Sequence, residues 1–110
     1  MGRWVDFTAL SNLPNGGNHI ESIEGEEIAV VNIANHFYAF INECPHAYLP
    51  LIEDGEQAEL DTEQTILTCP HHGAKFCLKT GDVKAPPAFD ELTCYPTRVQ
   101  DDIVQIELPD

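Results

Sequence analysis

Two short segments that combine cysteine, proline and histidine constrain this chain of 110 residues more than any other feature. The first reads C-P-H at residues 44–46, and the second reads C-P-H-H-G at residues 69–73. Each follows a run of residues with strand character. The proline after each cysteine fixes φ and removes a backbone donor, and Gly73 permits a tight bend. We therefore expect two stiff loops that each present one thiolate and one imidazole.

Four side chains of these loops form a mixed sulfur and nitrogen ligand set: Cys44, His46, Cys69 and His72. Iron–sulfur clusters are held by cysteine thiolates, and in one class two histidines replace two cysteines on one iron. Zinc is an alternative on ligand type, although zinc knuckles usually pair like ligands and this order is mixed. The C-x-x-H spacing favours His72 over its neighbour His71 as the second histidine.

Other interpretations of the cysteines and histidines fit less well. A disulfide between the two loop cysteines is unusual where thiols are kept reduced. A catalytic Cys–His pair needs a third group to orient the histidine, and the sequence nominates none. Cys77 and Cys94 lie in strand-like runs, and we interpret both as small buried apolar side chains. His19 and His36 stand alone and are interpreted as structural residues.

The rest of the chain alternates short apolar runs with turn residues, which predicts an all-β fold. Expected strands cover residues 4–7, 28–33, 37–41, 65–68, 76–78, 93–99 and 103–108. Turns are expected at residues 14–17, 24–26, 35–36 and 101–102. The turn at 24–26 should join a segment that contains Ile20 and Ile23 to residues 28–33 in a hairpin. Residues 53–63 hold six acidic side chains and no basic one, and we expect an exposed loop or one turn of helix there. One domain over residues 1–110, a sandwich or a barrel, accounts for these features.

The two loops resemble those of the Rieske ferredoxin family, whose small proteins carry electrons to ring-hydroxylating oxygenases. The likeness is most specific over C-P-H-H-G-A-K-F at residues 69–76, and it covers nearly the whole chain. It implies a fold of three antiparallel sheets, in which loops at about residues 43–50 and 69–76 form a small cluster-binding subdomain. A third loop at about residues 84–89, which contains two prolines, would cover the cluster.

The resemblance also implies the cofactor, which is one Rieske-type [2Fe–2S] cluster per chain. Carried over by position, Cys44 and Cys69 would bind one iron. His46 and His72 would bind the other iron.

Two departures from other Rieske proteins bear on the cluster. In respiratory and photosynthetic complexes an extra cysteine in each loop forms a disulfide, but this chain has Leu49 and His71 at those positions. Those proteins also have a serine that donates a hydrogen bond to a cluster sulfur, where this chain has Ala74. Fewer hydrogen bonds to the sulfurs stabilise the reduced cluster less. We expect a potential toward the low end of the Rieske range of about −150 to +300 mV.

These features predict an electron carrier, not an enzyme. An oxygenase would also need a mononuclear iron site of two histidines and one carboxylate, and only 38 residues follow His72. The resemblance implies two partners, a flavin-dependent reductase linked to NAD(P)H and the terminal oxygenase of an aromatic-hydrocarbon catabolic system. Alternatives are the small Rieske-like subunit of an assimilatory nitrite reductase and a zinc-binding interaction module without a redox role.

Charge and hydropathy bear on partners and location. Nineteen acidic and five basic residues give a net charge of −14, which repels nucleic acid and anionic membranes. Such a charge suits a basic protein partner, or it serves solubility alone. No apolar run is long enough to span a membrane, and the first residues lack the apolar region of a signal peptide. We expect a cytoplasmic monomer that binds neither nucleic acid nor membrane, with residues 53–63 as a neutral surface insertion.

Overall fold

The computed structural model describes residues 2–43, 50–52, 59–61, 63, 65–69, 73–85 and 92–109, and it consists of three antiparallel sheets. Sheet A has the order β1-β11-β10, with β1 (Arg3–Ala9), β11 (Ile103–Leu108) and β10 (Thr97–Gln100). Sheet B has the order β2-β3-β4-β9, with β2 (Asn18–Ile23), β3 (Glu26–Ile33), β4 (His36–Ile41) and β9 (Cys94–Tyr95). Sheet C has the order β5-β6-β7-β8, with β5 (Glu59–Asp61), β6 (Ile66–Thr68), β7 (Lys75–Cys77) and β8 (Val83–Ala85). The expected all-β fold of three antiparallel sheets is confirmed.

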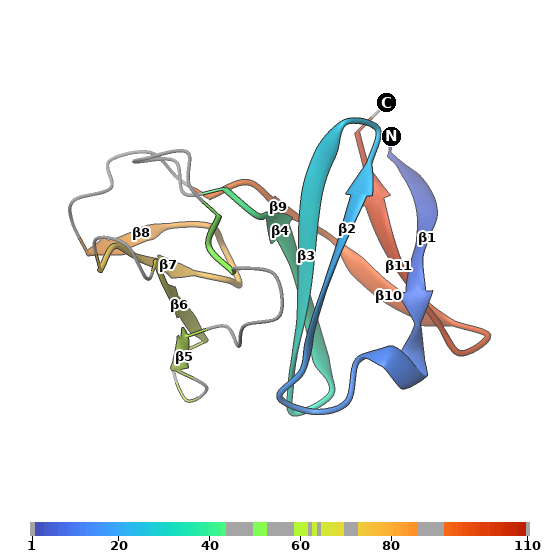
Figure 1. The fold of residues 1–110 in the computed structure, drawn as a ribbon, viewed down its shortest axis with the longest axis horizontal. Coiled ribbons are helices and arrows are strands. Elements are labelled where there is room, and N and C mark those ends of the chain that lie inside the picture. Colours follow the sequence, from blue (N-terminus) through green and yellow to red (C-terminus); the bar gives the residue numbers. More distant parts are fainter. Residues whose placement is uncertain are drawn as a thin grey trace.

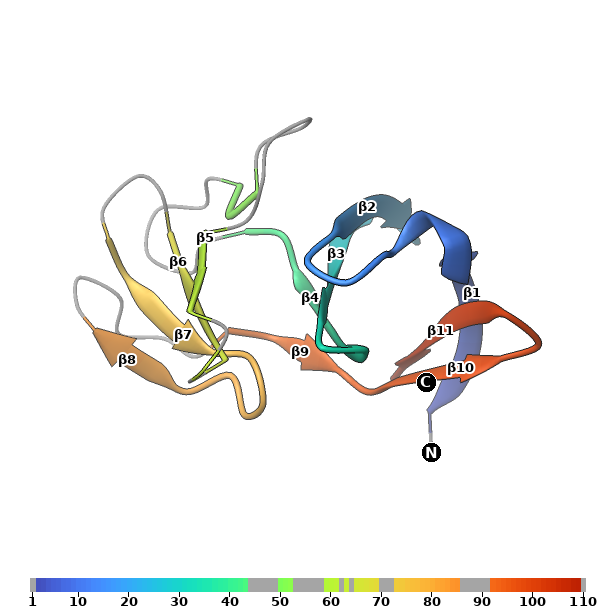
Figure 2. The same cartoon turned by 90° about the horizontal axis from the view of Figure 1, so that it is seen from below.

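Sheet C stands to one side of sheets A and B, which lie close to each other (Figure 1). The chain leaves sheet B after β4 and returns to it at β9, so sheet C lies within the segment between these two strands (Figure 2). Both termini lie together on sheet A, because Arg3 pairs with Leu108. The only helix among the described residues is the 3-10 turn η1 (Leu10–Asn12), and no described helix is long and apolar enough to cross a membrane.

Strand β3 is buried on both faces, and this explains its uninterrupted apolar run. Ile28 and Val30 belong to a core that also contains residues of β1 and β11. The alternate residues Ala29, Val31 and Ile33 belong to a second core, shared with sheet C. Successive side chains of a strand point to opposite faces, so one strand can contribute to two cores.

Each core joins two sheets. The core between sheets A and B is formed by Phe7, Leu13, Ile28, Val30, Ala39, Val104, Ile106 and Leu108. The core between sheets B and C is formed by Ala29, Val31, Ile33, Phe40, Leu51, Ile52, Leu67, Cys69, Ala74, Phe76, Leu78 and Leu92. The second core includes residues on both sides of the expected ligand loops, so burial of apolar surface fixes where these loops begin and end.

Two hairpin turns lie where the sequence predicts them, and a third lies one residue earlier than predicted. Glu24 and Gly25 connect β2 to β3, and Asp101 and Asp102 connect β10 to β11. All four have positive φ, as the tight turns that match the twist of paired strands require. The turn before β4 consists of residues 34 and 35, so His36 is the first residue of a strand and not part of the turn.

Two sequence-based expectations about strands were wrong. Part of the acidic segment 53–63 forms β5, which pairs with β6, because Leu60 packs against the core between sheets B and C. The expected strand 93–99 is divided at Pro96 into β9 of sheet B and β10 of sheet A. Proline has no N–H to donate, and here its carbonyl accepts a hydrogen bond from the Glu107 N–H at 3.0 Å.

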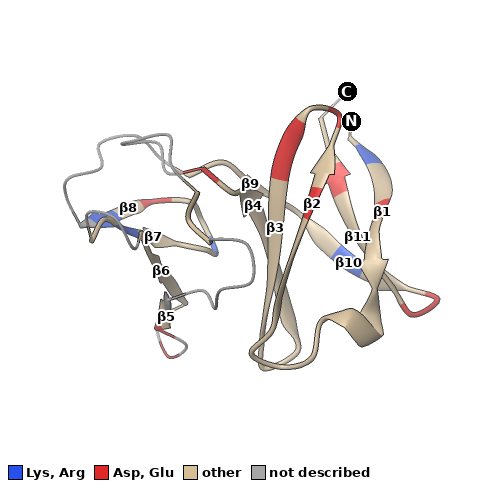
Figure 3. Cartoon of the chain, in the orientation of Figure 1, with Lys and Arg blue, Asp and Glu red and all other residues tan. Residues whose placement is uncertain are grey.

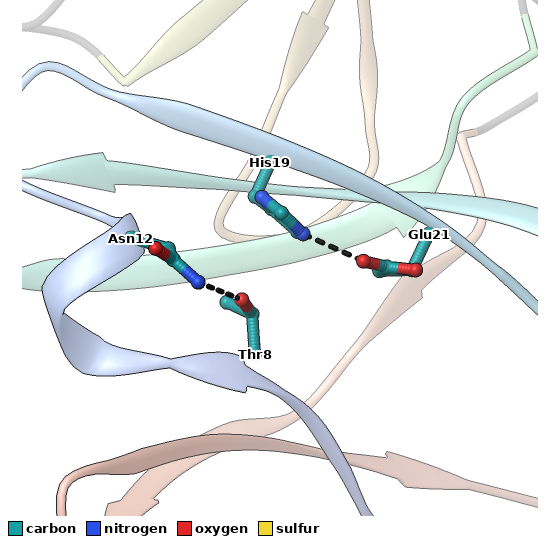
Figure 4. A network of polar contacts seen from close by, with 4 residues as sticks. All are labelled: Thr8, Asn12, His19 and Glu21. Carbon is teal, nitrogen blue, oxygen red and sulfur yellow. Dashed lines mark hydrogen bonds and ion pairs between the residues drawn. The ribbon is translucent and has the colours of Figure 1, made fainter.

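Polar side chains fix the connection from β1 through η1 to β2 (Figure 4). Asn12 donates a hydrogen bond to the Thr8 hydroxyl at 3.0 Å. His19 lies 2.7 Å from a carboxylate oxygen of Glu21 and packs edge-on against the ring of Phe7. These contacts give His19 a structural environment in β2, away from sheet C.

Replacing Gly81 with alanine should destabilise the fold more than the same change at Gly25. Both glycines have φ of +85°, so both variants carry the left-handed strain of about 1–2 kcal/mol. A methyl group at residue 81 would also overlap the Leu92 carbonyl, whereas nothing lies near residue 25. We expect an additional loss of about 1–3 kcal/mol for Gly81→Ala, measured by denaturant unfolding. Equal losses in the two variants would contradict this prediction.

Candidate metal centre

Cys69 is the one expected ligand within the described residues, and it is buried directly after β6. Its N–H donates to the carbonyl of Ala74 at 2.7 Å, and its carbonyl accepts from the N–H of Gly73 at 3.0 Å. Gly73 has φ of +77°, which a glycine adopts without strain. Backbone hydrogen bonds therefore join the described residues on either side of the second loop, and the thiol of Cys69 lies at its start.

The surroundings of Cys69 suit a soft metal ligand. Its side chain is 1% exposed and belongs to the core between sheets B and C, as does Ala74. A thiolate held in an apolar and largely dry site is the kind of donor that iron–sulfur clusters take. The donor chemistry of this residue thus fits the expected cofactor.

The other expected ligands, Cys44, His46 and His72, lie outside the described residues, as does His71. In the part of the chain that the structure describes, no three His, Cys, Asp or Glu side chains are grouped as metal ligands. The full ligand set consequently stays a prediction. The expected covering loop at about 84–89 is described only at its start, in β8.

The described residues around the first and third loops show how those loops are bounded. Asn42 and Ile52 lie on either side of the first loop and are joined by hydrogen bonds of 2.8 and 2.9 Å. Beyond the third loop, the N–H of Leu92 donates to the carbonyl of Gly81 at 2.9 Å. Sequence patterns did not single out Asn42, because a lone asparagine before a loop is usually a turn residue.

Three exposed lysine side chains lie on two strands of sheet C and in the turn between these strands. Lys75 on β7 and Lys84 on β8 are exposed and lie on paired strands, and Lys79 is exposed in the turn between them. Figure 3 shows these basic positions in sheet C, and acidic segments on β2, β3 and β11. Three of the chain's five basic residues thus follow the second loop, and they make the local potential less negative than the net charge suggests.

Cys77 and Cys94 are only partly buried, which corrects their interpretation as buried apolar side chains. Burial raises the pKa of the Cys94 thiol to about 11, and the nearby Cys77 adds to this. Burial also acts on Cys77, but hydrogen bonds from the Thr80 side chain and from backbone groups at Lys79 and Thr80 outweigh it and lower its pKa. The two thiols therefore differ in their expected reactivity.

Comparison with known proteins places these features in a family. A model described as the Rieske [2Fe-2S] domain matches residues 3–96. A 3-phenylpropionate/cinnamic acid dioxygenase ferredoxin subunit from Shigella boydii serotype 4 (strain Sb227) is 39% identical over 83 residues, which cover 76% of this chain and 74% of that protein. The chain therefore belongs to the Rieske [2Fe–2S] domain family.

Solved structures show the same fold. The ferredoxin of carbazole 1,9a-dioxygenase from Nocardioides aromaticivorans IC177 has a TM-score of 0.83 and 26% identity, and the match covers 97% of this chain and 98% of that one. A Mycobacterium tuberculosis protein, described provisionally as an NADH-dependent nitrite reductase small subunit, has a TM-score of 0.82 and 18% identity, covering 100% and 98%. At that identity the second match shows the fold alone.

Within this family the chain is a ferredoxin, an electron carrier whose cofactor is a Rieske-type [2Fe–2S] cluster. Its relatives bear the same description, as ferredoxin components rather than catalytic subunits. The resemblance seen in the sequence is confirmed.

Cys77 should react with iodoacetamide at a lower pH than Cys94 does, because the thiolate is the nucleophile. A thiol with a pKa of about 11 is only about one part in a thousand thiolate at pH 8, so Cys94 should stay nearly unlabelled there. Labelling of the cluster-loaded protein from pH 6 to 10, followed by peptide mass spectrometry, measures both rates. The Cys77→Ser variant is the control for site assignment. Equal rates at pH 7 would contradict the prediction.

Proposed function

We propose that this ferredoxin passes single electrons from a flavin-dependent, NAD(P)H-linked reductase to a terminal ring-hydroxylating oxygenase. The main support is its likeness, over nearly the full length of both chains, to the ferredoxin of a carbazole dioxygenase. The curated relative that is 39% identical is likewise the ferredoxin subunit of a dioxygenase. In this role the aromatic substrate is bound by the oxygenase, so this chain needs no substrate pocket of its own.

The proposed ligands are Cys44 and Cys69 on one iron, and His46 and His72 on the other. The buried thiol of Cys69, whose backbone is hydrogen-bonded to Gly73 and Ala74, supports the placement of the second loop. When bound, the cluster accepts and returns one electron at a time. The chain's own contribution is to hold the ligand loops on sheet C and to surround the thiol with apolar side chains.

We assign one Rieske domain to residues 1–110, with ligand loops at about 43–50 and 69–76 and a covering loop at about 84–89. The two cores support a single unit, because sheet B packs against sheet A on one face and against sheet C on the other. The net charge of −14 suits a monomer that binds neither nucleic acid nor membrane. The free cysteines among the described residues suit the cytoplasm, where thiols are kept reduced.

A small subunit of an assimilatory nitrite reductase is the second candidate. The fold is compatible with this candidate, because a protein described as a nitrite reductase small subunit has the same fold at 18% identity. A reconstituted assay separates the two candidates. With NADH, reductase and a ring-hydroxylating oxygenase, the ferredoxin should support substrate-dependent NADH oxidation. Stable copurification with a large nitrite reductase subunit, without activity in this assay, would favour the second candidate over the first.

The histidine assignment predicts different effects for two neighbouring residues. His72→Ala should abolish the electron paramagnetic resonance signal typical of a reduced Rieske cluster, because one iron loses a nitrogen ligand. His71→Ala is the matched control and should leave the signal unchanged. A signal that survives in the first variant and disappears in the second would show that the neighbouring histidine is the ligand. A colourless protein that binds zinc would instead support the zinc-binding module.

The reduction potential should lie below zero, near the low end of a range of about −150 to +300 mV. Ala74 follows the glycine of the second loop and is fully buried. Because alanine has no hydroxyl, its side chain cannot donate a hydrogen bond to the cluster. Ala74→Ser should raise the midpoint potential, because a hydroxyl hydrogen bond stabilises the reduced cluster. Protein-film voltammetry measures both values. A midpoint well above zero in the unchanged protein would contradict this expectation.

A further inference from the structure

We infer that Asn42 is a positioning residue for the cluster, because its side chain closes the base of the first ligand loop. This inference rests on the proposed ligands Cys44 and His46. Asn42 follows the last residue of β4 and is only 3% exposed. Its amide oxygen accepts a hydrogen bond from the Ile52 N–H at 2.8 Å, and its amide nitrogen donates to the Ile52 carbonyl at 2.9 Å.

In an antiparallel strand pair, two opposite residues exchange two backbone N–H···O hydrogen bonds. Here the side-chain amide of Asn42 takes the place of one backbone and makes both bonds with Ile52. The chain needs this substitute, since neither Asn42 nor Ile52 belongs to a strand. The second loop is closed differently, by the backbone bond from Cys69 to Ala74. Gly81 and Leu92, which lie before and after the third loop, are also joined by a backbone bond. Among the described residues, only the first loop has a side chain in this role.

Glu27 sets the orientation of the Asn42 amide. A carboxylate oxygen of Glu27 accepts a hydrogen bond from the amide nitrogen at 2.8 Å, so the nitrogen cannot exchange places with the oxygen. The backbone N–H of Asn42 also donates to the Glu27 carbonyl at 2.8 Å. Strand β3 thereby holds Asn42, and Asn42 holds Ile52, whose side chain is buried in the core between sheets B and C.

The consequence for the cluster follows from distance along the chain. Cys44 lies two residues beyond Asn42, so a change in the spacing between residues 42 and 52 displaces the proposed ligand. Groups that orient metal ligands typically change metal affinity about 10–100-fold when they are removed. Asn42→Ala would also leave the buried N–H and carbonyl of Ile52 without a partner.

The chain offers a matched control in Asn32, which is also buried and also binds backbone groups. Its amide nitrogen donates to the Leu13 carbonyl at 2.7 Å, and its oxygen accepts from the Asn35 N–H at 2.8 Å. Asn32 is on β3 and pairs with Phe37 near the start of β4, whereas the first loop follows the end of β4. Asn42→Ala and Asn32→Ala therefore remove similar bonds in different places.

The test is the rate at which the oxidised protein loses its visible absorbance in the presence of an iron chelator. Each variant is measured at the same interval below its own unfolding midpoint, so that loss of the cluster is separated from loss of the fold. We expect loss about 10–100-fold faster in Asn42→Ala, and within about threefold of the unchanged protein in Asn32→Ala. Equal rates in the two variants would overturn the inference.

A second pair of variants applies if Asn42→Ala does not fold. Asn42→Asp places two carboxylates together and should lose the cluster quickly. Adding Glu27→Gln supplies a donor to the new carboxylate and should slow cluster loss again, because a charge-assisted hydrogen bond replaces a repulsion. The rescue should be partial, since the Ile52 carbonyl still lacks the donor that the Asn42 amide supplied. Failure of this rescue would overturn the inference. If the unchanged protein binds no cluster, the proposed ligands fail as well, whereas a normal cluster with no effect at Asn42 leaves them intact.

Discussion

Burial of β3 on both faces is the interaction on which the other elements depend. Ile28 and Val30 pack toward sheet A, while Ala29 and Val31 pack toward sheet C. Full burial of a valine or isoleucine side chain contributes about 1.5–3 kcal/mol, so a few residues of one strand link two cores. Sheet C is consequently attached to sheet B by the same strand that attaches sheet B to sheet A. A polar substitution in this run would weaken both attachments at once.

Much of the fold could be predicted from local patterns, and the exceptions have physical reasons. The apolar run at residues 28–31 marks β3, and paired aspartates at residues 101 and 102 mark a tight turn. Strands β5 and β8 were not predicted, because β5 has one apolar residue within an acidic segment and β8 is a short segment with a lysine at its centre. The division of β9 from β10 at Pro96 was missed because apolar and β-branched residues continue on both sides of it. Which sheet each half joins is decided by pairing partners distant in the chain.

Candidate ligands can be nominated from the sequence by residue type, whereas roles that depend on contacts cannot. Cys69 could be nominated from its motif, and its burial after β6 agrees with a ligand role. Asn42 could not, because its partners are a carboxylate on β3 and a backbone ten residues away. Cys77 was interpreted as a buried apolar residue, since sequence does not show the hydrogen bonds from Thr80 and its neighbour. A role that a side chain plays by binding distant backbone groups cannot be recognised from composition or from residue spacing.

The pairing of β4 with β9 has a consequence for folding. Phe40 pairs with Cys94, and the Ile41 N–H donates to the Thr93 carbonyl, so the ends of a segment of about fifty residues must meet. Closing such a long loop costs more conformational entropy than closing a local hairpin. We therefore expect the pairing of β4 with β9 to form late in folding. A metal cluster held by the proposed ligands between residues 44 and 72 would join two points inside that segment, and this crosslink would shorten the loop that has to close. Assembly of the cofactor and completion of sheet B are then thermodynamically linked, and the cell's supply of iron and sulfide becomes a determinant of how much of this protein is folded.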